Sequence, residues 1–198
     1  MKLVVAITGA SGVVYAVRLL EALEGHEGVE VHLIVSRNGE RLLRHECGLS
    51  TEDISRHAHV VHSPSDIGAR PASGSARMDA MAIVPCSVKT LAQIAAGTGD
   101  NLVGRAADVI LKEGRKLVLV LREAPFSSIH LENMLKLARM GVTILPASPG
   151  FYHQPKTFDD LVNHVVGKTL DCLGFDQTLF PRWAGQAPER KGGRGAEG

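Results

Sequence analysis

A glycine-rich turn near the amino terminus has the composition of a phosphate-binding loop. The residues TGASG occupy positions 8–12, between the apolar run Leu3–Ile7 and a stretch with helical spacing. Glycine lets a backbone turn sharply and approach a ligand closely, and the first turn of a helix offers unpaired N–H groups to an anion. Gly9, Ala10 and Ser11 are therefore candidate phosphate ligands. A tight strand-to-helix turn without any ligand would use the same glycines, so this motif alone leaves both interpretations open.

A second turn of this kind follows a later apolar run. PCSVKT, at positions 85–90, comes after Ala80–Val84 and precedes the helical stretch LAQIAAG. Ser87, Lys89 and Thr90 could hold a phosphate or the edge of a flavin, or Ser87 could be only the helix N-cap. Two such turns on neighbouring parallel strands favour a binding site. Neither is a G-x-G-x-x-G motif and no Walker lysine follows, which disfavours NAD and ATP.

Dispersed cations could neutralise a bound phosphate. Arg105 and Lys112 are seven residues apart in a helical stretch and so share one face, and Arg122 ends an apolar run where α/β sheets place their ligands. Tyr152 and Lys168 follow later. The ordinary alternative to phosphate binding is that these side chains are simply solvated, and this alternative is weakest for Arg122 at the end of a strand. The sequence has no metal-ligand spacing, so we expect cations rather than a metal ion to hold the phosphate.

Two carboxylates are candidates for proton transfer. Glu123 directly follows Arg122, and Glu46 ends the charged helical stretch RNGERLLRHE. Glu123 could instead pair with a neighbouring cation, and Glu46 could be an ordinary surface residue. The nine histidines are scattered and receive no role.

The elements that must position these residues alternate between strands and helices. Five short runs rich in Val, Ile and Leu have no polar face, as in parallel strands covered on both sides: Leu3–Ile7, Val31–Val35, Ala80–Val84, Leu117–Leu121 and Val142–Leu145. Helical spacing occupies Val13–Leu23, Val103–Glu113, Leu131–Met140 and Phe158–Leu173, the last with Thr157 as its expected N-cap. The pattern predicts a Rossmann-like, flavodoxin-like, doubly wound parallel sheet.

Composition favours a single globular domain. The chain has 198 residues, 44% hydrophobic and 22% charged, with a formal net charge of +1, so no global field favours nucleic acid or a membrane. Three widely spaced cysteines fit a reducing cytoplasm. We expect the domain at residues 1–183, a functional or disordered loop at Ser63–Arg77, and a disordered tail at residues 184–198.

Taken in order, six motifs resemble those of the UbiX-type flavin prenyltransferases. The similarity runs from Lys2 to about Trp183 and rests on TGASG, PASGS at 71–75, IVPCSVKT at 83–90, RAADVILKE at 105–113, VLREAPFSSIHLENM at 120–134 and PGFYHQP at 149–155. Each motif alone is modest, but six in the same order make the resemblance specific.

The resemblance implies a ligand and a role for each candidate. FMN would be held by Gly9, Ala10, Ser11, Ser36, Ser87, Val88, Lys89, Thr90 and Arg122. The phosphate of dimethylallyl phosphate would be held by Tyr152 and Lys168, with help from Arg105, Lys112 and Arg122. Glu46, Glu123 and Lys112 would take part in catalysis.

The implied reaction alkylates reduced FMN at N5, releases phosphate and closes a fourth ring through C6. The product, prenylated FMN, would serve a UbiD-type decarboxylase, and the enzyme would be a dodecamer with its flavin sites between subunits. An FMN-dependent cysteine decarboxylase of the phosphopantothenoylcysteine type is the alternative enzyme, with His62 near the place of its catalytic histidine. A non-enzymatic flavin carrier is the third. Tyr152 and Lys168 favour the prenyl phosphate.

Overall fold

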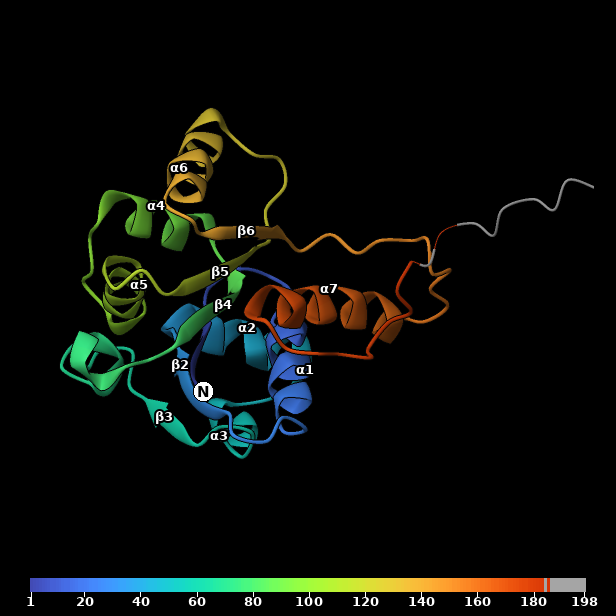
Figure 1. The fold of residues 1–198 in the computed structure, drawn as a ribbon, viewed down its shortest axis with the longest axis horizontal. Helices are drawn as coiled ribbons and strands as arrows, with labels where there is room; N and C mark the ends of the chain where they lie inside the picture. Colours follow the sequence, from blue (N-terminus) through green and yellow to red (C-terminus); the bar gives the residue numbers. More distant parts are fainter. Residues whose placement is uncertain (184, 186–198) are drawn as a thin grey trace, which may run out of the picture.

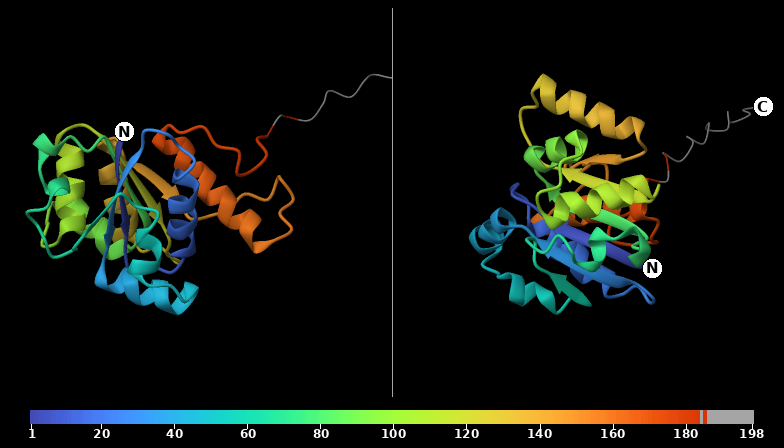
Figure 2. Two further views of the ribbon diagram at one scale, coloured as in Figure 1. Left: turned by 90° about the horizontal axis from the view of Figure 1, so that it is seen from below. Right: turned by 90° about the vertical axis from the view of Figure 1, so that its left-hand side faces the viewer.

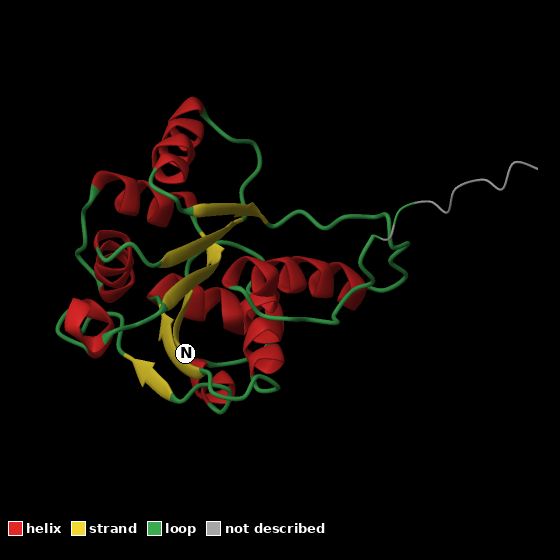
Figure 3. Ribbon diagram, viewed as in Figure 1, coloured by secondary structure: helices red, strands yellow, loops and turns green. Residues whose placement is uncertain are grey.

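The computed structural model describes residues 1–183 and 185 and contains one parallel sheet covered by helices on both faces (Figures 1 and 3). The tail expected at residues 184–198 lies outside the described residues, apart from Gly185. The sheet has the order β3-β2-β1-β4-β5-β6, and every neighbouring pair is parallel. The predicted doubly wound fold is confirmed.

The bounds of the elements are close to those predicted. The strands are β1 Lys2–Ile7, β2 Glu30–Val35, β3 Val60–His62, β4 Ala80–Cys86, β5 Lys116–Leu121 and β6 Thr143–Pro146. The helices are α1 Val14–Leu23, α2 Arg37–Cys47, α3 Thr51–Ser55, α4 Val88–Ala96, α5 Leu102–Lys112, α6 Ser128–Arg139 and α7 Phe158–Leu173, with short 3-10 turns at η1 Arg70–Ala72 and η2 Gly74–Ala76.

Alternate residues of the strands β1, β2, β4 and β5 enter two separate hydrophobic cores. In β1, Leu3, Val5 and Ile7 pack with α1 and α7, whereas Val4 and Ala6 pack with α4 and α5. Figure 2 shows α1 and α7 side by side on one face of the sheet, with α4 and α5 on the other. Because both faces are covered, the central strands β1, β4 and β5 are apolar on both faces, as predicted from their composition.

The long polar loop at residues 63–77 is folded against α5. The carbonyl of Pro64 accepts a hydrogen bond from the Leu102 N–H at 2.9 Å, and Arg115 Nη2 donates to the Gly74 carbonyl at 3.1 Å. These bonds fix the two ends of the segment that contains η1 and η2. The first residues of the loop are thereby held beside the carboxyl ends of the strands.

The strand order reverses between β1 and β4, which lie side by side at the centre of the sheet. Helices follow these two strands on opposite faces, so a crevice opens between the loops at their carboxyl ends. Ligands of open α/β sheets bind at such a switch point. Among the described residues no helix is long and apolar enough to cross a membrane.

Candidate active site

The two predicted ligand-binding turns lie together at the carboxyl ends of β1 and β4. The buried Thr8 side chain joins them: its Oγ1 donates to the Pro85 carbonyl at 2.8 Å and accepts from the Ser87 N–H at 2.9 Å. A single hydroxyl thus holds TGASG against PCSVKT. The expectation that the two turns belong to neighbouring strands is confirmed.

Two helices direct their amino termini into the crevice. Ser36 caps α2 by accepting a hydrogen bond from the Gly39 N–H at 3.1 Å, and Ser87 caps α4 by accepting from the Thr90 N–H at 3.2 Å. A helix amino terminus has a partial positive charge and spare N–H groups. Ser87 is therefore both the N-cap considered from the sequence and part of the crevice.

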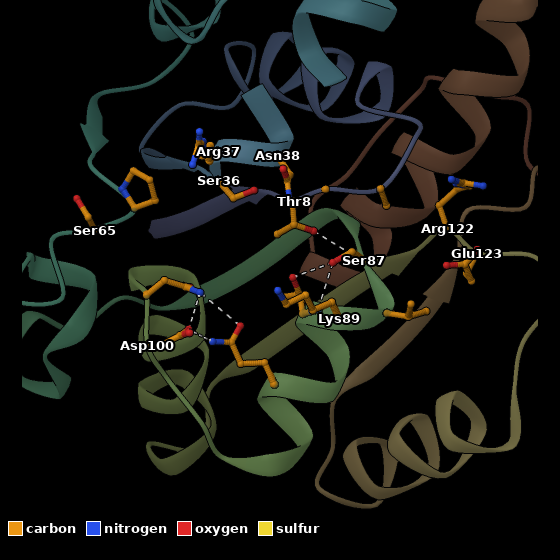
Figure 4. Close-up of a pocket in the computed structure, with 17 residues that line it drawn as sticks. Thr8, Ser36, Arg37, Asn38, Ser65, Ser87, Lys89, Asp100, Arg122 and Glu123 are labelled. Atoms are coloured by element: carbon orange, nitrogen blue, oxygen red, sulfur yellow. Dashed lines mark hydrogen bonds between the residues drawn. The ribbon is translucent and has the colours of Figure 1, made fainter. Parts of the chain in front are cut away.

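The crevice is a pocket of about 500 Å³ (Figure 4). Its lining comprises Thr8, Gly9, Ala10, Ser36, Arg37, Asn38, Pro64, Ser65, Ser87, Val88, Lys89, Thr90, Gln93, Asp100, Asn101, Arg122 and Glu123. Of the residues expected to hold FMN, all except Ser11 are in this lining. At Gly9 an added Cβ would lie 2.7 Å from Cβ of Asn38, so the backbone approaches the start of α2 too closely for a side chain.

Arg122 gives the pocket its positive charge at the end of β5. Its Nε donates to the carbonyl of Ser11 at 3.2 Å, which couples the strand end to the first turn. Ser11 itself lies just outside the lining and contributes this carbonyl. Glu123 lines the pocket beside Arg122, and its Oε1 accepts the Ala124 N–H at 3.0 Å. Burial raises the pKa of the nearby Tyr15 phenol, while the charge of Arg122 opposes that shift.

Glu46 supports the pocket from outside. Its Oε2 accepts hydrogen bonds from the N–H groups of Gly12 at 2.8 Å and Val13 at 3.2 Å. The carboxylate thus binds spare backbone donors just before α1 and fixes the end of the TGASG turn. Glu46 is one of the two candidates for proton transfer, and within a single chain its carboxylate makes these two capping contacts.

The side chains expected to hold the substrate phosphate are dispersed in a single chain. Arg105 pairs with Asp108 at 2.9 Å and Lys168 with Asp171 at 3.7 Å, and neither lines the pocket. Lys112 ends α5, close to the start of β5 and so toward the opposite edge of the sheet. An 11-residue helix is about 16 Å long, so Lys112 is far from the pocket of its own chain.

Comparisons with known proteins decide the family. Residues 1–170 match the family model described as Flavoprotein. A probable UbiX-like flavin prenyltransferase of a Streptomyces species is 52% identical over 98% of this chain and 97% of its own length. The flavin prenyltransferase UbiX of Methanocaldococcus jannaschii is 48% identical over 92% of this chain and 98% of its own length.

The chain belongs to the UbiX-type flavin prenyltransferases. The predicted family is thereby confirmed.

Solved structures of flavin prenyltransferase relatives share the whole fold. A dodecameric FMN-dependent UbiX-like decarboxylase from Escherichia coli O157:H7 matches with a TM-score of 0.92 and 51% identity, over 93% of this chain and 100% of that one. AnUbiX (PadA1), solved with FMN and dimethylallyl pyrophosphate, matches with a TM-score of 0.91 and 43% identity, over 94% and 98%. The peptidyl-cysteine decarboxylase EpiD is only 18% identical with a TM-score of 0.57, which shows a related fold alone.

Several residues of the prenyltransferase pocket were missed from the sequence. Asn38 and Arg37 begin α2, and Asp100 and Asn101 precede α5, where Asn101 Oδ1 accepts the Gly104 N–H at 3.0 Å. The signal available was the position of these polar residues at the starts of helices. Ser65, from the long loop, gave no such signal because its place depends on hydrogen bonds distant in sequence.

Proposed function

We propose that this protein joins a dimethylallyl group to N5 and C6 of reduced FMN. The donor is dimethylallyl phosphate, phosphate is released, and the product is prenylated FMN for a UbiD-type decarboxylase. The observation that carries the proposal is the pocket at the β1–β4 switch point, lined by eight of the nine residues expected to bind flavin, in a chain 48–52% identical to flavin prenyltransferases.

The pocket fits FMN in size and in chemistry. Its volume of about 500 Å³ lies within the roughly 300–1,000 Å³ typical of small-molecule sites. Two helix amino termini and their serine caps offer donors to a phosphate, and Lys89, Arg37 and Arg122 supply positive charge. The aliphatic side chain of Val88 and the backbone at Gly9 and Ala10 leave room for a planar ring.

The chain's own residues would orient the reactants and assist departure of the phosphate. Arg122, at the end of β5, can direct a guanidinium toward an anion while its Nε remains bonded to Ser11. Of the two carboxylates that are candidates for proton transfer, Glu123 lines the pocket and Glu46 does not, so we propose Glu123 for proton transfer. Glu46 would contribute by fixing the turn at residues 8–12. The FMN itself supplies the nucleophilic nitrogen and carbon.

The remaining phosphate ligands would come from neighbouring copies in a homo-dodecamer. Lys112 lies far from its own pocket, and Arg105, Tyr152 and Lys168 are exposed outside it. The E. coli relative is a dodecamer. The helix α6 supports association, because Ile129, Leu131 and Leu135 are 65%, 54% and 51% exposed. We propose that α6 packs against another copy and that Lys112 reaches a neighbour's pocket.

We propose that the enzyme works in the cytoplasm. Cys47, Cys86 and Cys172 are free thiols, as is usual in a reducing compartment. Its proposed substrates are soluble phosphates, and UbiD-type decarboxylases would receive the product.

One experiment tests the proposed function directly. The purified protein is incubated without oxygen with reduced FMN and dimethylallyl phosphate, and the flavin is extracted for mass spectrometry. We expect a flavin heavier by one prenyl unit, together with release of one phosphate per flavin. Dimethylallyl pyrophosphate in a parallel reaction tests the donor. If only unmodified FMN is recovered, the protein is a carrier; if a cysteine substrate is decarboxylated instead, it belongs to the alternative enzyme class.

A further inference from the structure

The loop that carries Tyr152 contains no strand or helix. Residues 147–157 connect β6 to α7 and contain Tyr152, which is 43% exposed. Gln154 in the same loop has a positive φ of 54°, a conformation that side chains rarely adopt. A residue that must contact a substrate phosphate needs a defined position, so contacts outside the loop have to provide it.

His164 of α7 makes those contacts. Its side chain is 7% exposed, and its Nδ1 accepts a hydrogen bond from the Gly150 N–H at 3.1 Å. The ring centroids of Tyr152 and His164 are 5.7 Å apart, with the ring planes at 76°. A Cβ added at Gly150 would lie 3.0 Å from His164 Nε2 and 3.2 Å from Tyr152 Cε1. Gly150, Tyr152 and His164 are therefore closely packed against one another.

Two further rings hold the His164 imidazole. His153 stacks on it with centroids 5.2 Å apart and ring planes 4° from parallel, and Phe180 lies 4.6 Å away at a tilt of 43°. Both nitrogens of His153 are buried without a hydrogen-bond partner among the described residues, so His153 acts in this cluster as a packing ring. Because His164 belongs to α7, these contacts hold the loop and Tyr152 in a fixed position relative to that helix.

We propose that His164 is a positioning residue for substrate binding. It accepts the Gly150 N–H and forms the wall on which the Tyr152 ring rests, and so fixes the phenol where the substrate phosphate binds. This inference rests on the proposed function, which assigns Tyr152 to that phosphate. His164 itself contacts neither FMN nor substrate in this arrangement, because it is buried behind Tyr152 and outside the pocket lining.

The hydrogen bond requires one protonation state of His164. Nδ1 can accept the Gly150 N–H only without a proton, so the ring is neutral with its proton on Nε2. Burial, and then the charges of His153 and Lys168, lower the pKa of His164, which favours this state. Since the folded pKa lies below the unfolded one, the bond is present above the unfolded pKa and is lost as pH falls through the folded pKa. The titratable and charged groups that act on the ring are Tyr152 and His153 from the loop and Lys168 from α7. Asp160 of α7 acts on the neighbouring His153, and Arg18 of α1 is bonded to Asn163, the residue before His164.

A matched pair of variants tests the proposal. In His164→Asn the amide oxygen can take the place of Nδ1, whereas His164→Leu keeps a similar volume without an acceptor. For His164→Leu we expect KM for dimethylallyl phosphate to rise about threefold to tenfold with a smaller change in kcat, as for loss of one hydrogen bond. His164→Asn keeps the acceptor but loses the ring, so its KM should rise by less than that of His164→Leu. Bound FMN should be unchanged in both, since α7 does not line the pocket.

A double-mutant cycle separates positioning from general structural damage. In the Tyr152→Phe background, His164→Leu should add little further increase in KM, because its effect passes through Tyr152. The ratio of wild-type KM to His164→Asn KM should rise as pH is lowered, since the substituted amide does not titrate. Titration of the substrate phosphate affects both KM values equally, so its effect cancels in this ratio. An unchanged KM in His164→Leu, equal losses in the two variants, or additive losses with Tyr152→Phe would each overturn the proposal.

Hydrogen exchange makes the proposal independent of activity. We would measure peptide-resolved exchange over residues 149–155 and correct it for intrinsic rates. Protection of these amides should decrease as pH is lowered in the wild type and should not depend on pH in His164→Asn. If the wild-type protein makes no prenylated FMN, the proposed function fails while this measurement still reports the bond. If exchange over the loop is identical in wild type and His164→Leu, the positioning role fails even where prenyl transfer is observed.

Discussion

At the scale of single residues, side chains bonded to backbone groups set the geometry of the pocket. Thr8 is 2% exposed, and its side chain bonds to backbone groups of the PCSVKT turn, 77 and 79 residues away in sequence. Arg122 similarly bonds to the carbonyl of Ser11, and Glu46 to the N–H groups of Gly12 and Val13. The TGASG turn is therefore fixed from three sides.

Lys168 is expected to hold the leaving phosphate. Lys168→Ala removes a charge-assisted contact to a phosphate, worth about 1.5–3 kcal/mol, so kcat/KM should fall about tenfold to more than a hundredfold. Among residues 1–183 and 185, the ion pair of Lys168 is with Asp171 at 3.7 Å, a partly exposed contact of little value to stability. Steady-state kinetics measure the effect, with Lys156→Ala as a matched lysine control expected to stay within about twofold. A wild-type rate in Lys168→Ala would place the phosphate elsewhere.

Glu46 is expected to act through structure. Glu46→Ala removes the acceptor of two backbone N–H groups and should lower the free energy of unfolding by about 1 kcal/mol, the usual value for an exposed hydrogen bond. Glu46→Gln keeps one acceptor oxygen and should lose less. Chemical denaturation measures both, alongside FMN retention. A Glu46→Gln variant with normal stability and flavin content but a more than about tenfold lower kcat would show proton transfer instead.

The sequence predicted which turns form the site but not these links. Gly9, Ala10 and the residues of PCSVKT were identifiable because glycine, serine and lysine follow apolar strands directly. The bond from Glu46 to Gly12 joins residues 34 apart, and no local pattern marks such a partner. The capping contact of Glu46 could therefore not be predicted, and proton transfer by Glu46 stays a prediction beside it.

At the scale of elements, predictability followed length and burial. The long apolar strands were predicted within two residues, and α7 was placed correctly at Phe158–Leu173 with Thr157 as its N-cap. The edge strand β3 and the helix α3 were missed, because three and five residues are too short for a periodic pattern. The start of α6 was predicted three residues late, since Ser127 and His130 form a capping box that begins before the apolar residues.

Helix α6 is the element whose surface is least explained by its own chain. Only Leu137 of its residues is buried, while Leu131 and Leu135, one turn apart, are 54% and 51% exposed. Figures 1 and 2 show α6 at the outer end of the molecule, beyond β6. An apolar stripe in this position suits contact with another copy.

Substitution in that stripe should separate the subunits. Leu135→Glu places a charge in the proposed interface and removes about 1.5–3 kcal/mol of apolar burial at every copy. We expect a smaller assembly by light scattering and reduced prenyl transfer. Thermal unfolding should stay cooperative but occur at a lower temperature, because association no longer stabilises the folded subunit. Glu132→Gln on the same helix is the matched control and should keep the native assembly. If Leu135→Glu assembles like wild type, α6 is not an interface.

At the scale of the whole molecule, net charge gives no hint of the site. The chain has a formal net charge of +1, yet Arg37, Lys89 and Arg122 meet at one pocket. The fold concentrates these charges by bringing the ends of β2, β4 and β5 to one edge of the sheet. Lys112, in contrast, is kept away from the pocket by the fold. Helical spacing places it on one face of α5 with Arg105, but the length of α5 puts it near the amino-terminal ends of the strands, opposite the pocket.

The distribution of charge leads to a prediction about metal ions. A flavin phosphate and a prenyl phosphate together bring several negative charges, and the chain offers guanidinium and ammonium groups to neutralise them. These groups are present in the folded protein at all times, so phosphate departure should not depend on added Mg²⁺. We expect exhaustive EDTA treatment to leave the rate of prenyl transfer within about twofold, a barrier change of about 0.4 kcal/mol. The matched control is the same concentration of EDTA already saturated with Mg²⁺, which keeps any direct effect of the chelator. If free EDTA lowers the rate of prenyl transfer strongly and added Mg²⁺ restores that rate, a metal ion, and not Arg122 with its neighbours, neutralises the charge of the leaving phosphate.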